Sequence, residues 1–385
     1  MADDASNIEK YVISMRRQFH EYPELSFQEE QTEGVIIEEL EGMGLRPVLV
    51  PKGGLYADIK GGTEGKTVAL RADMDALPVR EENDIPFKSR NDGVMHACGH
   101  DAHMAMLLGV AKSLMQKRDQ FNGTVRLLFQ RAEEMPPGGA VELIKAGALK
   151  NVDCVVGQHV MSDAPAGIVA VFQKECMANA DEFRIRIHSK GGHGAYPHTG
   201  VDTLMIGSML VVQAQTIVSR MLDPTEAAVV TFGKMDSGFR YNVIAAHTDL
   251  RGTVRTFSEA GRDKCEKSLK EMAANLCKTY GAEFEFEFLR GYPALINNPE
   301  IVSVVESVAR KVVGEKNIIH PKPQMGGEDF AYYAQQVPSA FYFLGTTDKN
   351  ETNPGANHSP QFSIDESALS KGTRLMEEIA LKLLL

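Results

Sequence analysis

Residues 66–74 of the chain, KTVALRADM, form a short apolar run that ends in a turn rich in aspartate. Three similar runs follow, separated by segments with the apolar spacing of helices: TVRLLFQ at 124–130, VDCVVGQHV at 152–160 and AFYFLGT at 340–346. Buried strands that alternate with helices are typical of a mostly parallel sheet with helices on both faces. We therefore predict an α/β fold for the larger part of the 385 residues.

The pattern changes near residue 181. An alternating strand at 181–189 precedes a helical stretch at 202–221, and the elements that follow are two strands at 227–235 and 247–257, a helix at 261–280 and a strand at 282–289. The order β-α-β-β-α-β is that of a ferredoxin-like α+β domain. We predict that residues 183–295 form this domain, inserted into a larger α/β domain made of residues 1–182 and 296–385.

The composition of the chain indicates which kinds of molecule the protein binds and where it is located. The chain has 41 basic and 52 acidic residues, and its net charge of −11 opposes binding to nucleic acid or to an anionic membrane surface. The opening residues lack the features of a secretory signal, and no apolar run approaches the roughly 18 residues of a membrane span. Five scattered cysteines fit a reducing compartment better than a disulfide framework. We expect a cytoplasmic protein that acts on a small molecule.

Side chains that bind metals follow the predicted strands. Ligands of a parallel sheet bind beyond the carboxyl ends of its strands, so groups placed there meet at one edge. Cys98 and His100, within MHACGHDAH at 95–103, are separated only by Gly99 and point to the same side of a turn or extended segment. The groups that follow strands are Asp73, Asp75, Glu133, Glu134, His159 and His358. Together they predict a metal site.

The residue types also indicate which ions would bind. Thiolate and imidazole suit Zn²⁺, whereas carboxylate and imidazole also suit Mn²⁺ and Co²⁺. Six or more such side chains exceed the four ligands of one tetrahedral ion, so we predict two divalent ions. Of the adjacent pair Glu133 and Glu134, one carboxylate can bind metal while the other acts as a general base on water.

Several of these residues also have a purely structural interpretation. Asp73 and Asp75 fit either a capped turn or a group that hydrogen-bonds a metal ligand and orients it. His193, in KGGHGAYPH at 190–198, fits either a hairpin-like loop or a histidine that stabilises a substrate oxygen. In MGGEDF at 325–330, Gly327 would allow the backbone to approach a substrate closely.

These motifs, taken in order along the chain, resemble the M20 metallopeptidase family. The closest branch is that of the amidohydrolases, which includes N-acyl-amino-acid aminoacylases, hippurate hydrolase and auxin-conjugate hydrolases. The resemblance runs from about His20 to the C-terminus and rests on these stretches: FHEYPELSFQE, RADMDALPV, MHACGHDAHMAMLLG, FQRAEE, GQHV, KGGHGAYPH, YNVI, GTVRTF, GGEDF and NHSPQF.

The resemblance implies a set of site residues. Glu133 would be the base that activates a water molecule, and the ligands of a binuclear metal centre would be Cys98, His100, Glu134, His159 and His358. The wider family has His-x-Asp where this chain has Asp73-Met74-Asp75, a departure that matches the amidohydrolase branch and leaves Asp73 without an assigned role.

The inserted domain has its own implied roles. It would act as a lid and as the module through which a homodimer or higher homo-oligomer forms. His193 matches a loop histidine that reaches into the partner's site in several relatives and stabilises the oxyanion. Asn242, in YNVI, matches a position that contacts substrate.

We therefore predict a binuclear metal-dependent amidohydrolase that cleaves the amide bond of N-acyl amino acids. A dipeptidase or another small-amide hydrolase would use the same groups. A non-catalytic oligomer would use the inserted domain as an interaction surface, and a hydrolase with Cys98 as nucleophile would be inactivated by thiol alkylation but not by chelators. The acyl group, the amino acid and the native metal stay open.

Overall fold

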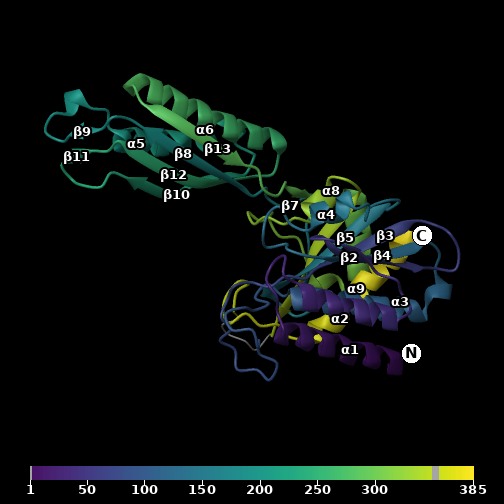
Figure 1. The fold of residues 1–385 in the computed structure, drawn as a ribbon. Helices are drawn as coiled ribbons and strands as arrows, with labels where there is room; N and C mark the ends of the chain where they lie inside the picture. The colour runs from purple at the N-terminus through teal and green to yellow at the C-terminus, as the bar shows by residue number, and fades with distance from the viewer. Residues whose placement is uncertain (1, 349–354) are drawn as a thin grey trace. The chain divides into compact units, whose positions relative to one another are not determined.

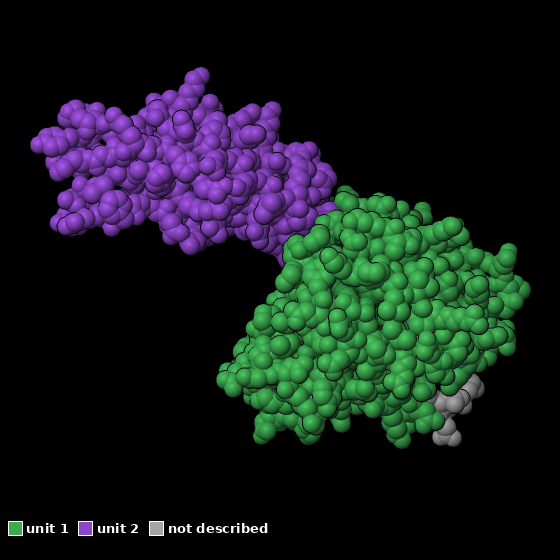
Figure 2. Space-filling view, viewed as in Figure 1, with its two compact units in different colours: residues 1–176, 296–322, 329–385 green, residues 177–295, 323–328 purple. Residues whose placement is uncertain are grey.

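A computed structural model describes residues 2–348 and 355–385 (Figure 1). The chain divides into two compact units (Figure 2): residues 1–176, 296–322 and 329–385 form unit 1, and residues 177–295 and 323–328 form unit 2. Unit 2 thus begins at residue 177 rather than at the expected residue 183, and it takes in 323–328 as well. The reason is backbone pairing, because the N–H of Ala178 donates to the carbonyl of Gln324 at 3.0 Å.

Unit 1 is built on a mixed, mostly parallel sheet. In spatial order its strands are β1 (Val48–Val50), β2 (Gly54–Lys60), β4 (Thr124–Gln130), β3 (Thr67–Asp73), β5 (Cys154–Pro165), β16 (Ser339–Thr347), β6 (Val169–Val171) and β15 (Ile318–Ile319). The four central strands, β4, β3, β5 and β16, are parallel to one another, whereas β2 joins β4 antiparallel. Asp73 pairs with Gln130 at the ends of β3 and β4, so the segments that follow leave the sheet at the same edge.

Helices cover both faces of this sheet. On one face, Val68, Leu70 and Ala72 of β3 share an apolar core with residues of five helices: α1 (Ala2–Glu21), α2 (Glu30–Gly42), α3 (His100–Gln116), α7 (Pro299–Val312) and α9 (Ser367–Leu384). The short helices α4 (Ala140–Lys145) and α8 (Ala331–Ala334) lie on the other face (Figure 1). Because both faces are buried, the central strands are apolar without alternation, and the predicted α/β class is confirmed.

Unit 2 has the expected element order β-α-β-β-α-β. Its antiparallel sheet contains, in spatial order, β10 (Ala228–Ser237), β12 (His247–Thr256), β8 (Asp181–His188) and β13 (Glu283–Leu289). Phe183, Ile185 and Ile187 pack against α5 (Thr203–Thr216) and α6 (Glu259–Tyr280), so both helices cover one face. A two-stranded ribbon, β9 (Gly192–His193) with β11 (Val243–Ile244), completes the unit.

Helix α5 corrects one expectation. With the π-helical turn that follows, residues Thr203–Met221 form a helix of 19 residues that is long and apolar enough, by length and composition, to cross a membrane. The expectation that no apolar run approaches this length was wrong here. The inner face packs on the sheet through residues such as Ile206 and Leu210, while only 28% of the apolar window is buried. The outer face of α5 is therefore apolar and exposed.

Candidate metal centre

The turn after β3 is organised by Asp75, which is 1% exposed. Its Oδ1 accepts the backbone N–H of Glu133 at 3.0 Å and lies 3.2 Å from Nδ1 of His100. Its Oδ2 accepts the N–H of Glu134 at 2.9 Å and the hydroxyl of Ser26 at 2.7 Å. One buried carboxylate thereby fixes the loop that carries both glutamates and the ring of a predicted ligand.

The segment Cys98-Gly99-His100 enters helix α3, which begins at His100. Gly99 has a φ of 88°, in the left-handed region that favours glycine. A Cβ atom at this position would lie 2.3 Å from Cγ2 of Val160. Glycine is therefore required between the two ligand-type side chains, both for the backbone conformation and for the close packing on β5.

The structure brings the five predicted ligands to one place. Sγ of Cys98 lies 3.5 Å from Nε2 of His159. Oε1 of Glu134 lies 4.0 Å from Nε2 of His100 and 3.2 Å from Nε2 of His358. Ligand atoms of Cys98, His100 and Glu134 all lie within 4.8 Å of one another.

The hydrogen bonds of the two buried imidazoles leave their Nε2 atoms available. Nδ1 of His100 donates to the carbonyl oxygen of Asp75 at 2.8 Å, and Nδ1 of His159 donates to the carbonyl oxygen of Val160 at 2.6 Å. Nε2 of His100 is buried and accepts no hydrogen bond within the described residues. Imidazole Nε2 atoms that face a thiol and a carboxylate are a donor set that fits a divalent cation, which would displace the thiol proton on binding.

Electrostatics also favour positive charge at this point. Burial of the His100 ring opposes protonation, but the charge of Asp73 and the hydrogen bond to Asp75 help to outweigh it, and the pKa of His100 is raised well above its usual range. Burial, together with the neighbouring His103, lowers the pKa of His159 well below its usual range and keeps this imidazole neutral. A neutral imidazole is the form that binds metals.

Cys98 does not resemble a nucleophile. Burial and the charge of Glu134 raise the pKa of its thiol to about 12. Nucleophilic thiols have a lowered pKa and are partly exposed, whereas Cys98 is buried. A bound cation would instead stabilise the thiolate as a ligand, so the geometry favours the metal interpretation of this residue.

Glu133 precedes the predicted ligand Glu134 in the chain. The residue is 6% exposed, and its carboxylate lies within 4.8 Å of that of Asp329. Ala132, which precedes it, has a φ of 53°, and the N–H of Ala132 donates to Oε1 of Glu29 at 2.7 Å. The hydrogen bond to Glu29 thus holds the left-handed turn at Ala132 that leads from β4 into the loop of the two glutamates.

Three predicted residues lie in unit 2. His193 is exposed on β9, pairs with Val243 of β11 and accepts the N–H of Ala195 on its Nδ1 at 3.1 Å. Asn242 is exposed, and its carbonyl accepts the N–H of Gly194 at 2.9 Å. A Cβ at Gly327 would lie 2.7 Å from Cβ of Ala180, so close packing inside unit 2 already explains that glycine. The metal-ligand side chains belong to unit 1.

Sequence reasoning missed several residues that support the site. Ser26 and Glu29 hold the loop of the two glutamates from the segment before α2. His103 follows His100 by three residues on the same helix and hydrogen-bonds Asp73 at 2.5 Å. The i, i+3 spacing of the two histidines in MHACGHDAH was the available signal for His103. Ser26 and Glu29 lie in FHEYPELSFQE, one of the stretches that carry the family resemblance, but no residue pattern there indicated their contacts with the loop.

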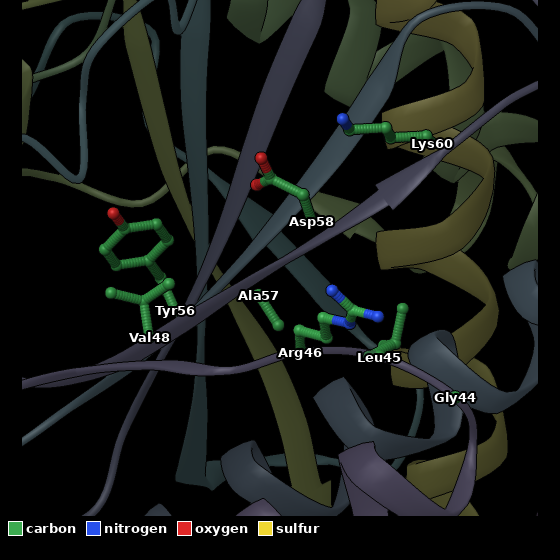
Figure 3. A pocket seen from close by; sticks show the side chains of 8 residues that line it. All are labelled: Gly44, Leu45, Arg46, Val48, Tyr56, Ala57, Asp58 and Lys60. Atoms are coloured by element: carbon green, nitrogen blue, oxygen red, sulfur yellow. The ribbon is translucent and has the colours of Figure 1, made fainter.

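A separate pocket lies on the β1–β2 side of unit 1 (Figure 3). Its volume is about 310 Å³, and its lining residues are Gly44, Leu45, Arg46, Val48, Tyr56, Ala57, Asp58 and Lys60. None of the predicted site residues lines it. This pocket is therefore distinct from the metal-ligand cluster.

A parallel sheet that gathers a thiol, three imidazoles and a carboxylate at one edge, next to another buried carboxylate, defines a metal-dependent hydrolase of the α/β class. Comparison with known sequences makes the assignment more specific. The chain belongs to Peptidase family M20/M25/M40, whose profile matches residues 69–382. The predicted family is confirmed, and with it a hydrolase that acts on amide C–N bonds.

Individual relatives and solved structures of this family match most of the chain. The N-acyl-L-amino acid amidohydrolase of Geobacillus stearothermophilus is 44% identical over 75% of this chain and 78% of its own length. Thermostable carboxypeptidase 1 of Saccharolobus solfataricus is 38% identical over 99% of this chain and 98% of its own. Among solved structures, the YXEP protein of Bacillus subtilis, described as a dinuclear metal-binding peptidase, has a TM-score of 0.86 and 34% identity, covering 98% of this chain and 99% of that one.

Proposed function

We propose that the protein is a binuclear metal-dependent amidohydrolase that releases the acyl group from N-acyl amino acids. The observation that carries this proposal is the convergence of five ligand-type side chains, two of them imidazoles whose Nδ1 atoms are already hydrogen-bonded. In this proposal, the residues that hold two divalent ions, Mn²⁺ or Zn²⁺ and also Co²⁺, are Cys98, His100, Glu134, His159 and His358.

When bound, the cations would polarise the amide carbonyl and lower the pKa of the attacking water. Glu133 takes a proton from this water as the C–O bond forms, and it delivers the proton to the amide nitrogen as the C–N bond breaks. The products are a carboxylate and a free amine. Asp75 keeps Glu133 in place through the backbone N–H of that residue.

Substrate contacts come from unit 2 in this proposal. His193 stabilises the oxyanion by donating from its ring, either within its own chain or across a dimer. Asn242 lies next to it on the same ribbon, since the N–H of Gly194 donates to the carbonyl of Asn242, and it hydrogen-bonds the substrate. Gly327 gives the backbone close access to the substrate. Unit 2 thereby acts as a lid.

Unit 2 also forms the dimer interface in our proposal. On the outer face of α5, Val212 is 72% exposed and Leu204 is 46% exposed, and Met205 and Met209 are exposed at helical spacing with Val212. A face this apolar on a protein of the cytoplasm, the compartment we propose from its five free cysteines, needs a cover. A second copy meets that need through a self-complementary contact.

Sedimentation of two variants tests the dimer. Val212→Glu places a charge in the apolar face and is expected to yield monomers, while Gln213→Glu, one residue further along at an exposed polar position, should keep the wild-type mass. A Val212→Glu protein that sediments as wild type would contradict this interface.

A second candidate function is a peptidase. It is favoured by the carboxypeptidase relative, which matches nearly the whole chain. The two functions share the catalytic groups and differ in the acyl half of the substrate.

Amine release separates these candidates. The substrates are N-acetyl, N-benzoyl and long-chain N-acyl amino acids and several dipeptides, each with Mn²⁺- or Zn²⁺-loaded protein and with chelator. We expect metal-dependent release from the acyl amino acids. Release from dipeptides alone would make the protein a peptidase, and no release from any substrate would favour a non-catalytic oligomer.

A further inference from the structure

His103 uses both of its ring nitrogens inside the protein. Its Nδ1 lies 2.5 Å from Oδ1 of Asp73, and its Nε2 lies 2.9 Å from the backbone nitrogen of Val160. A backbone N–H can only donate, so Nε2 accepts, and the ring proton must be on Nδ1, where it donates to Asp73. Although His103 lies among groups that could bind metal, its lone pair is already engaged.

Val160 connects His103 to a metal ligand. The N–H of Val160 donates to His103, and the carbonyl of the same residue accepts Nδ1–H of His159 at 2.6 Å. Strand β3 pairs with β5 only as far as Arg71 and Gly157. Beyond that pair, His103 takes the place of a strand partner for Val160, and the position of this backbone sets the direction of the His159 ring.

Asp73 is itself held from behind. Nη1 of Arg71 donates to Oδ2 of Asp73 at 2.6 Å. The same guanidinium donates to Asp329 at 2.8 Å through Nη2 and to Gln130 at 3.0 Å through Nε. All of these residues are at most 1% exposed. Two buried anchors besides Asp73, Asp329 and Gln130, thus fix the guanidinium, which fixes the carboxylate that His103 needs.

We propose that His103 is a positioning residue for metal binding, which holds the end of β5 so that Nε2 of His159 faces the metal, and that Asp73 acts by fixing the tautomer of His103. This inference rests on the proposed metal centre and gives Asp73 a role. In this proposal neither His103 nor Asp73 is a metal ligand, although Oδ2 of Asp73 lies 3.7 Å from Nε2 of His100.

Two amide variants separate the bonds of His103. In His103→Gln, the side-chain oxygen can reach the place of Nε2 and accept from Val160. In His103→Asn, the amide nitrogen takes the place of Nδ1 and donates to Asp73, but Val160 N–H loses its acceptor. We expect the dissociation constant for Co²⁺ to rise about 10- to 100-fold in the Asn variant, the range for loss of a group that orients a ligand, and to change much less in the Gln variant.

The readouts do not depend on turnover. Equilibrium dialysis gives the Co²⁺ affinity, and the visible spectrum of bound Co²⁺ reports the ligand geometry, which should change in the Asn variant and be retained in the Gln variant. Nitrogen NMR of metal-free wild-type protein should show His103 protonated on Nδ1. His96→Asn, at an equally buried histidine of the same segment, serves as control and should keep the wild-type spectrum.

Results against the role of His103 can be distinguished from results against the metal centre. Equal affinity and unchanged spectra in both His103 variants, or equal loss in both, would overturn the proposal, as would a proton found on Nε2 of His103. Wild-type protein that binds no Co²⁺ would overturn the metal centre itself and this inference with it. Metal binding in wild type with the wrong pattern among variants would overturn only the role of His103.

Discussion

Replacement of Asp75 by asparagine hardly changes the size of the side chain, but it should lower both the stability of the protein and its metal affinity. Each carboxylate oxygen of Asp75 faces a backbone N–H, since Oδ1 accepts from Glu133 and Oδ2 accepts from Glu134. An asparagine has one oxygen, so either orientation of its amide turns an NH₂ group against an N–H donor. The variant cannot satisfy both glutamate backbones at once.

The loss can be sized from these contacts. Two donors meet each oxygen, because Ser26 also donates to Oδ2 and His100 lies near Oδ1. Asparagine therefore loses two hydrogen bonds to a charged acceptor, each of about 1.5–3 kcal/mol, and we expect unfolding free energy to fall by about 3–6 kcal/mol. The Ser26→Ala variant loses only one such bond, so its free energy of unfolding should fall by about half as much.

Urea titration of the metal-free proteins measures this difference. Circular dichroism is the suitable signal, because the chain has no tryptophan. Metal affinity, measured in parallel, should fall in Asp75→Asn because the variant cannot hold the backbones of both Glu133 and Glu134, and Glu134 is a predicted ligand. An Asp75→Asn protein within about 1 kcal/mol of wild type, the value of one ordinary hydrogen bond, would refute the reasoning.

Three further predictions concern single residues in and around the candidate metal centre. Gly99→Ala forces alanine to a left-handed φ, at about 1–2 kcal/mol, and into Val160, so both stability and metal content should fall; unchanged metal content would contradict the packing. Glu133→Gln should lower kcat by at least about 10²-fold with metal content intact, and near-normal kcat would exclude Glu133 as the base. Burial and the charge of Asp75 raise the pKa of Glu29 from 4.5 to about 7. The folded protein therefore holds the proton of the Glu29 carboxyl more tightly than the unfolded chain does. The contribution of Glu29 to the free energy of unfolding should fall as pH rises from about 4.5 to 7, by about 3 kcal/mol in total. Urea titrations across this range should lose that slope in Glu29→Gln, and a slope equal to wild type would show that Glu29 is not its source.

Much of the fold and site could be predicted because the controlling patterns are local. Residues 66–74 form an apolar run that ends next to Asp73 and Asp75. The neighbouring parallel strand is of similar length, so both strands end at the same level, where Asp73 pairs with Gln130. Polar groups after such strands then meet at one edge without any knowledge of side-chain contacts.

The remaining features depend on contacts between distant segments. Glu29 reaches the backbone of Ala132, and His103 reaches that of Val160 on another strand. Such bonds depend on side-chain directions that apolar periodicity does not encode. The exposed outer face of α5 was missed for the same reason, since an apolar helix has the same composition whether one face or both are buried.

Metal content per chain tests the central claim most directly. After loading with Mn²⁺ or Zn²⁺ and dialysis, the wild-type protein should hold two ions per chain, and Glu134→Ala should hold fewer and lose activity, because Glu134 lies close to both His100 and His358. A wild-type protein that hydrolyses N-acyl amino acids with no metal bound, or a Glu134→Ala protein that keeps both ions, would contradict the account.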